Sequence, residues 1–270
     1  MKSKKRDFIR MLVGADSHCG SRAGLTPPDH WQHGSAYYGQ QQKTWKFYED
    51  TVNSLKPIDI FVFNGDAIDG KGAKSGGTEI YEADRHKQVD IAAECFKIID
   101  ADVHKFIVGT SYHVGVEEDF EHELARRFEA ELEGHAMFEV KGVTFDCKHH
   151  IGSSTIPHGR YTNIAKHGMW NKIWADRGGQ PRADVTIRSH VHYFDYCGTP
   201  DWLGVITPAL QGFGSKFGVR QCEGVVDFGL IWFDIYDDAS KYGRKYDFGY
   251  KIMEYEVVKQ KEKFESRLRG

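Results

Sequence analysis

Short apolar runs that stop abruptly at an aspartate or a histidine are the feature that most limits how this chain can fold. The clearest run extends from Ile58 to Phe63 and is followed at once by Asn64-Gly65-Asp66. A run of this length, rich in aromatic and β-branched residues, predicts a buried strand. Gly65 lets the backbone turn at the carboxyl end of that strand, where open α/β sheets place their functional groups. We therefore expect Asp66 to face a crevice at the edge of a sheet.

Four further strand-like segments end in the same way. Residues 8–15, 103–108 and 183–188 predict single strands, and residues 137–147 predict a hairpin that turns at Lys141-Gly142. These segments lead into Asp16-Ser17-His18, Gly109-Thr110-Ser111-Tyr112-His113, Ser189-His190-Val191-His192 and Lys148-His149-His150. Because side chains alternate along a strand, an Asp-x-His triplet in extended geometry turns both groups to one face. Carboxylate and imidazole together suit a divalent transition metal, although a single triplet is more commonly a surface turn.

Helical periodicity separates these strands, which predicts an α/β fold. The expected helices cover 40–55, 81–100, 120–133 and 161–176, and later strands, expected to be antiparallel, cover 204–207, 225–236 and 248–258. Residues 19–39 are irregular and predict a mostly exposed loop whose Trp31, Tyr37 and Tyr38 could stack on a substrate, although packing over a loop is the commoner use. Residues 70–77 predict a flexible basic loop.

Composition narrows the class of protein. A chain of 270 residues with 40% hydrophobic and 28% charged residues is ordinary for a globular protein, and its length suits one large domain. The net charge of −3 argues against a broad nucleic-acid-binding face. The five cysteines are scattered, with no Cys-x-x-Cys pair, which favours a reducing cytoplasm over a disulfide framework. The basic start of the chain is followed by an apolar segment too short for a signal peptide, and no run is long enough to span a membrane.

In chain order the strand ends give Asp-x-His, Gly-Asp-x-x-Asp, a Gly-to-His segment, His and His-x-His. This order resembles the calcineurin-like metallophosphoesterase family, and phage and prophage members are similar in general appearance. The resemblance spans residues 16–192. It implies a four-layer α/β/β/α sandwich of two mixed β-sheets flanked by helices, formed by a single domain over 1–270. Residues 193–258 would complete the second sheet, and 259–270 would form a charged tail.

By position, the resemblance implies two metal ions bridged by Asp66. One ion would be bound by Asp16, His18 and His192, and the other by His149 and His190. His149 is preferred to His150 because the ligand in the family closes its strand. His150 and Arg160 would contact the substrate. Further candidates for phosphate binding or ligand orientation, for which a plain loop or capping role is the simpler interpretation, are Ser153, His158, Asp69, Lys71 and Lys74.

Two departures from the family pattern affect the site. Ser189 replaces the usual glycine of the last motif, which is a mild change. The third motif lacks its asparagine ligand and has two extra residues before His113. Thr110 or a main-chain carbonyl could fill that coordination position. Alternatively His113 itself binds metal, which would leave the general acid unassigned; we favour His113 as the acid.

The resemblance implies a binuclear metal-dependent phosphoesterase, and the aromatic residues of the loop at 19–39 favour a phosphodiester as the substrate. A metal-bridging hydroxide would attack phosphorus in line, and His113 would protonate the leaving oxygen. Mn²⁺ is the preferred metal, with Fe, Zn and Ni open. The expected partner is a phosphoester substrate, with nucleotides and nucleic acids among the candidates, and no membrane is expected as a partner. A nuclease of the same family is one alternative, and phosphomonoesters and phosphoproteins stay open. Two alternatives belong to other functional classes. One is a non-catalytic metal-binding scaffold, and the other is a purely structural metal site at His190-x-His192.

Overall fold

The computed structural model describes residues 6–72, 76–114, 120–213, 226–238 and 243–254. Lys74, Cys222 and the expected tail at 259–270 lie outside these ranges. The described strands form a six-stranded sheet in the order β11-β10-β1-β2-β3-β4 and a five-stranded sheet in the order β5-β6-β7-β9-β8. We call these the first and the second sheet.

The first sheet has a parallel part and an antiparallel part. Its parallel strands are β1 (Phe8–Gly14), β2 (Ile60–Phe63), β3 (Val103–Ile107) and β4 (Leu132–Glu133). On the other side of β1 lie β10 (Gly229–Tyr236) and β11 (Tyr246–Ile252), both antiparallel to their neighbours. Arg10 of β1 faces Asp234 of β10 in register and forms two hydrogen bonds of 2.7 Å with its carboxylate. This ion pair fixes the register between the two strands.

The second sheet is also mixed. Its strands are β5 (Ala136–Val140), β6 (Val143–Cys147), β7 (Val185–Arg188), β8 (Asp195–Thr199) and β9 (Trp202–Ile206). The hairpin between β5 and β6 turns at Lys141 and Gly142, which both have positive φ, as the sequence predicts. The expectation that residues 193–258 complete the second sheet is only partly correct. β8 and β9 join it, whereas β10 and β11 extend the first sheet, because β1 would otherwise present an unpaired edge.

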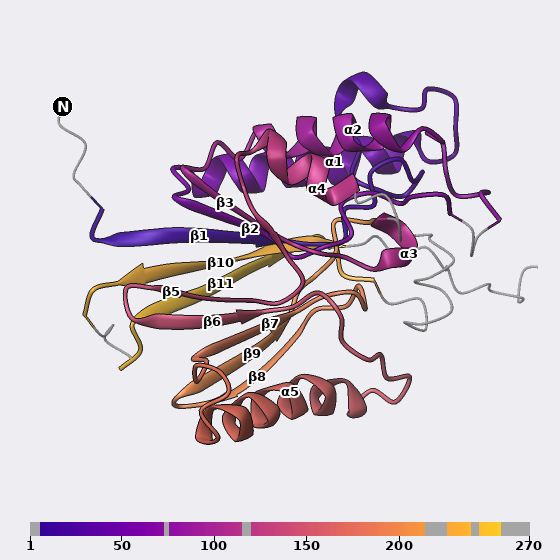
Figure 1. The fold of residues 1–270 in the computed structure, drawn as a ribbon. Coiled ribbons are helices and arrows are strands. Elements are labelled where there is room, and N and C mark those ends of the chain that lie inside the picture. Colours follow the sequence, from indigo (N-terminus) through magenta and orange to yellow (C-terminus); the bar gives the residue numbers. More distant parts are fainter. Residues whose placement is uncertain (1–5, 73–75, 115–119, 214–225, 239–242, 255–270) are drawn as a thin grey trace, which may run out of the picture.

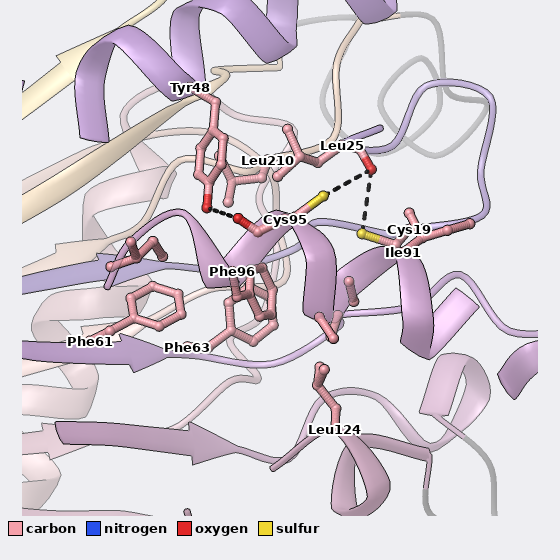
Figure 2. Packing of buried hydrophobic residues seen from close by; sticks show 14 of the residues in the cluster. Cys19, Leu25, Tyr48, Phe61, Phe63, Ile91, Cys95, Phe96, Leu124 and Leu210 are labelled. Carbon is pink, nitrogen blue, oxygen red and sulfur yellow. Dashed lines mark hydrogen bonds between the residues drawn. The ribbon is translucent and has the colours of Figure 1, made fainter. Parts of the chain in front are cut away.

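Side-chain alternation places the core on both faces of the first sheet. Met11 and Val62 belong to the apolar cluster between the two sheets. Their neighbours Leu12, Phe61 and Phe63 belong to the cluster on the opposite face, beneath the helices. Figure 2 shows this second cluster, in which Phe61 and Phe63 lie against Phe96 and in which the Tyr48 hydroxyl donates a hydrogen bond to the carbonyl of Cys95. Strands covered on both faces explain the uninterrupted apolar runs in the sequence.

Helices cover the outer face of each sheet (Figure 1). The first sheet is covered by α1 (Tyr38–Leu55), α2 (Arg85–Lys97) and α4 (Phe120–Arg127), and the second by α5 (Gly159–Asp176). The predicted four-layer α/β/β/α architecture is therefore confirmed. None of the helices in the described ranges combines the length and hydrophobicity that a bilayer-spanning segment requires.

Local differences from the predicted elements have identifiable causes. The helix expected over 120–133 ends at Arg127, because Glu129 takes a left-handed φ of 53° and the chain then enters β4. The helix expected over 81–100 is shortened to α2, whose start is capped by the Asp84 side chain accepting from His86 N. The short helix α3 (Ser111–Val114) and strand β8 were not expected.

Candidate metal centre

The predicted ligands come together because the ends of the strands are hydrogen-bonded to one another. In the first sheet, Asp16 N donates to Gly65 O at 2.9 Å and His18 N donates to Asp66 O at 3.1 Å. The two sheets are joined where His190 N donates to Asp16 Oδ2 at 3.1 Å. The Asp-x-His, Gly-Asp and His-x-His segments therefore form one edge, although they are far apart in the sequence. Figure 1 places α3, which carries His113, beside these ends.

The backbone at this edge is strained. In the described chain eight residues other than glycine have a positive φ, and five of them are proposed ligands: Asp16, His18, Asp66, His190 and His192. The left-handed region is unfavourable for residues with a Cβ and persists where the surrounding structure imposes it. Such residues cluster at functional sites, so the strain is independent support for a site here.

A first ligand group is formed by Asp16, His18 and His192, all buried. His18 Nε2 and His192 Nε2 are 3.2 Å apart, and Asp16 Oδ1 lies 3.9 Å from the former and 3.4 Å from the latter. Ligand atoms about 2.1 Å from one cation would be separated by about 3.0–3.4 Å. Among the described residues, Asp16 Oδ1 is a buried oxygen without a hydrogen-bond donor of good geometry. The distances from His192 Nε2 to the other two atoms fall in this range, the distance from Asp16 Oδ1 to His18 Nε2 is longer, and the buried oxygen without a donor is suited to a divalent cation.

A second ligand group is formed by Asp66, His149 and His190. Asp66 Oδ2 lies 3.0 Å from His149 Nε2 and 3.9 Å from His190 Nδ1. Thr110 Oγ1 lies 3.1 Å from both Asp66 Oδ2 and His190 Nδ1. Thr110 thus lies on the loop in which this chain has no asparagine ligand, and its hydroxyl faces the second ligand group. The second group therefore offers one carboxylate, two imidazoles and a hydroxyl to a cation.

Surrounding groups set which nitrogen of each ring faces the centre. His18 Nδ1 pairs with Asp69 Oδ1 at 3.0 Å, which leaves Nε2 for the first ligand group. His149 Nδ1 donates to Asn64 O at 2.7 Å, which leaves its Nε2 toward Asp66. Outer partners of this kind orient metal-binding histidines and fix their tautomers. Asp69, a secondary candidate in the sequence, lies in this outer layer.

His113 lies at the edge shared by the two ligand groups. One of its ring nitrogens lies within 4.8 Å of ligand atoms of both His18 and Asp66. Its ring meets the ring of His18 edge to face at 4.5 Å, and its Nδ1 donates to the main-chain oxygen of Asp69 at 3.0 Å. Nε2 is then the nitrogen with which His113 can give up or accept a proton. This geometry is compatible with the acid role and with the ligand role.

The other predicted residues lie outside the ligand groups. The ring of His150 packs on that of His190 at 4.8 Å and is exposed to solvent. The Arg160 guanidinium lies 4.3 Å above the ring of buried Tyr193, one residue after His192. The remaining loop candidates with described positions are exposed: Lys71, Ser153 and His158.

The loop at residues 19–39 agrees only in part with the expectation of a mostly exposed rim. Residues 19–27 are almost entirely buried, whereas residues 28–39 are partly or fully exposed. Trp31 packs against the apolar cluster under the helices and donates its Nε1 hydrogen to Thr26 O. Tyr38 packs edge to face on Trp31 as the first residue of α1. These aromatic side chains stabilise the loop, because they find apolar partners inside the protein.

Electrostatics couple the carboxylates and the imidazoles. Burial alone would lower the pKa of His149, but the charges of Asp66 and Asp16 raise it to about 10. Burial likewise opposes the protonation of His18, whereas Asp69 and the other carboxylates raise its pKa to about 9. The pKa of Asp66 lies well below its ordinary value, because His149 and His113 outweigh its burial. Burial lowers the pKa of His113, which is therefore neutral near pH 7.

Three supporting features were not anticipated from the sequence. Asn64 Nδ2 donates to Lys148 O and to Ser189 Oγ, so it joins the two sheets beneath the site. Ser189, in place of the usual glycine, uses its hydroxyl for this contact and for one with Thr207 at 2.7 Å. Glu121 of α4 is buried and accepts hydrogen bonds from two main-chain amides beside the ligands. Asn64 adjoins the Gly-Asp motif, but nothing in the sequence marks Glu121.

Glycine is required where the loops touch. Gly65 has a φ of 91°, and a Cβ there would lie 2.6 Å from His149 Nδ1. A Cβ at Gly109 would overlap the Asp66 carboxylate. The Gly-Asp sequence and the glycine after β3 thus permit the close approach of the backbone to the ligands.

No model of a known protein family and no curated protein matches the chain. Among solved structures, Vacuolar Protein Sorting 29 from Cryptosporidium parvum is 8% identical, with a TM-score of 0.49 over 93% of this chain and 100% of that one. Vps29 complexed with Zn²⁺ from Entamoeba histolytica is 12% identical, with a TM-score of 0.46 over 90% and 99%. A novel archaeal phosphodiesterase is 10% identical, with a TM-score of 0.47 over 91% and 100%.

At identities and TM-scores this low the matches assign no activity to this chain. The stronger observation comes from the chain itself. Side chains from five separate motifs meet at one edge of two sheets. The four-layer fold and the converging aspartates and histidines are those that the resemblance to the calcineurin-like metallophosphoesterases predicts.

Proposed function

We propose that this chain is a metal-dependent phosphoester hydrolase with a two-metal centre. The observation that carries the proposal is the position of Asp66, which lies against His149 Nε2 at 3.0 Å and also belongs to a ligand group with His18. A single carboxylate between two sets of imidazoles is suited to bridge two cations. Bound divalent cations would supply Lewis acidity toward the phosphoryl oxygens and would acidify a water molecule.

The chain's own residues would then divide the remaining tasks. Asp69 orients His18 through its carboxylate and His113 through its carbonyl. Neutral His113 can accept at Nε2 the proton that the attacking water gives up and pass it to the departing oxygen, which is the task of a general acid. His150, whose exposed ring packs on that of His190, would contact substrate from outside the ligand groups. Arg160 would act only at the rim, beyond Tyr193.

The finer assignments are proposals of the same kind. Mn²⁺ is the proposed metal. Aspartate, histidine and a hydroxyl are ligands that suit it, and Fe, Zn and Ni, which accept the same ligands, are the alternatives to test. The aromatic residues at 19–39 favour a phosphodiester, and the packing of Trp31 against the core weakens that argument. Nucleotides and nucleic acids stay among the substrates to test. A cytoplasmic location is supported by the free thiols of the four described cysteines: Cys19, Cys95, Cys147 and Cys197.

The proposal is tested by hydrolysis of bis(p-nitrophenyl) phosphate by metal-free protein to which Mn²⁺ is added. We expect metal-dependent turnover that falls more than about 100-fold in Asp66→Asn, as expected when a central metal ligand is lost. Asp50→Asn, which removes an exposed carboxylate paired with Lys46, should leave turnover unchanged. Mono-, di- and polynucleotide esters tested beside it define the substrate class. Protein that is saturated with Mn²⁺ and inert toward the whole panel would instead support a non-catalytic scaffold.

A further inference from the structure

Glu121 is a buried acidic residue of α4. The packing of this helix on the core does not depend on it. It is in the first turn of α4, and 1% of its surface is exposed. Its neighbours Phe120, Leu124 and Ala125 make the apolar contacts of α4 with the core. Among the described residues, no lysine, arginine or histidine forms an ion pair with it. A buried carboxylate without a cation is costly, so its hydrogen-bond partners should explain its presence.

Both carboxylate oxygens of Glu121 accept hydrogen bonds from loops of the proposed metal centre. Oε1 accepts from Ala67 N at 2.8 Å, directly after Asp66. Oε2 accepts from Gly109 N at 2.7 Å, directly before Thr110. One side chain therefore connects the loop after β2 with the loop after β3.

The same two loops meet a second time at the metal centre. Thr110 N donates to Asp66 Oδ1 at 2.5 Å, and Thr110 Oγ1 donates to Asp66 Oδ2 at 3.1 Å. Glu121, Gly109, Thr110, Asp66 and Ala67 thus form a closed ring of covalent and hydrogen bonds. The ring imposes the left-handed backbone of Asp66, whose φ is 58°. It also holds the Thr110 hydroxyl beside Asp66, on the loop in which the third motif of the family would have its asparagine ligand.

We propose that Glu121 is a positioning residue for the second ligand group, and that it sets the separation of Asp66 and Thr110 for a divalent cation. This inference rests on the proposed function. The first ligand group depends less on the ring, because Asp16 is tied to His190 N and Ala15 O accepts from Leu210 N at 2.9 Å. Loss of this ring should therefore weaken the ion that depends on both Asp66 and Thr110 more than the ion that shares Asp66 alone.

The test uses Glu121→Gln, which keeps the shape of the side chain. Its amide group turns an N–H toward one of the two main-chain donors, so one hydrogen bond is lost. Glu123→Gln is the matched control, since Glu123 is on the same helix and pairs with Arg127 at the surface. Metal-free proteins are titrated with Mn²⁺ alone by calorimetry, and electron paramagnetic resonance records the spin-coupled Mn²⁺ pair.

In wild type and Glu123→Gln we expect two bound Mn²⁺ ions and the coupled signal. In Glu121→Gln the weaker ion should lose about 10–100-fold in affinity, the range for residues that orient metal ligands, and the coupled signal should vanish at equal loading. If Glu121→Gln does not fold, Glu121→Asp, which cannot reach both amides, should show the same selective loss. Equal binding of both ions by the Glu121 variants would overturn this inference and leave the proposed function intact. Fewer than two ions in wild type would overturn both.

Discussion

Metal binding should tighten as the pH rises, because the ions compete with protons for His18 and His149. In the metal-free protein the pKa of His18 is raised to about 9 and that of His149 to about 10. Both imidazoles therefore carry a proton at pH 7, and a ring nitrogen must lose its proton before it can bind a metal. Each ligand group contains one of these two histidines. Each ion should therefore release about one proton when it binds.

One proton per ion makes the apparent association constant rise about tenfold per pH unit below the pKa. Between pH 6 and pH 8 we expect about a 100-fold gain for each ion. Calorimetric titration with Mn²⁺ in two buffers of different ionisation enthalpy counts the released protons directly. His86→Gln, which removes an exposed histidine paired with Glu123, should behave as wild type. A flat affinity profile without buffer-dependent heat would refute the assignment of the two protons.

The same protons should stabilise the metal-free fold. Because the pKa values of His18 and His149 in the folded state lie above the ordinary value of 6.5, this stabilisation is complete below pH 6.5 and is lost as the pH rises through 9 and 10. One pKa unit corresponds to about 1.4 kcal/mol, so the free energy of unfolding should fall by a few kcal/mol across this window. Urea unfolding at pH 6.5 and pH 9 measures the fall. A fall just as steep in His149→Gln would show that His149 does not contribute.

Three substitutions test single contacts. His113→Gln should slow hydrolysis of an alkyl phosphodiester about 10²–10⁴-fold but spare the p-nitrophenyl ester, whose leaving group needs no acid; loss of bound Mn²⁺ would identify His113 as a ligand instead. Thr110→Val removes only the hydroxyl and should weaken one Mn²⁺ ion about tenfold, whereas unchanged calorimetry would exclude Thr110 as a ligand. Arg188→Leu leaves buried Asp146 with His135 as its remaining side-chain partner and should cost about 3 kcal/mol in urea unfolding. The exposed Arg182, paired with Asp201, is its control: Arg182→Leu should cost below about 1 kcal/mol, and an equal loss in both would contradict the role of burial.

The sequence specified the strands and their ends well, because buried strands leave a strong local pattern. The run before Asp66 is apolar on both faces since Phe61 and Phe63 meet helices while Val62 meets the second sheet. A glycine after such a run signals a turn irrespective of the rest of the fold. Helix ends were less certain, because the left-handed turn at Glu129 that ends α4 has no glycine to mark it.

Long-range pairing and outer contacts could not be predicted in this way. Nothing local indicates that β10 pairs with β1, because the apolar pattern of a strand does not specify which sheet it joins. The sequence leaves Trp31 either stacking on a substrate or packing over its loop, and only the packed structure shows its contact with the core. Glu121 gave no signal at all, since its partners are main-chain amides, which are identical in every residue except proline.

By itself, then, the sequence determined which side chains are available for metal binding, since aspartate and histidine after strand-forming runs are a property of the chain. Tertiary structure decided which of them share a cation. His149 rather than His150 faces Asp66, because the carbonyl of Asn64, on the neighbouring sheet, turns its ring. Thr110 reaches the second ligand group because Glu121 ties its loop to that of Asp66. Ligand type is local chemistry, whereas ligand position depends on contacts between segments that meet only in the folded protein.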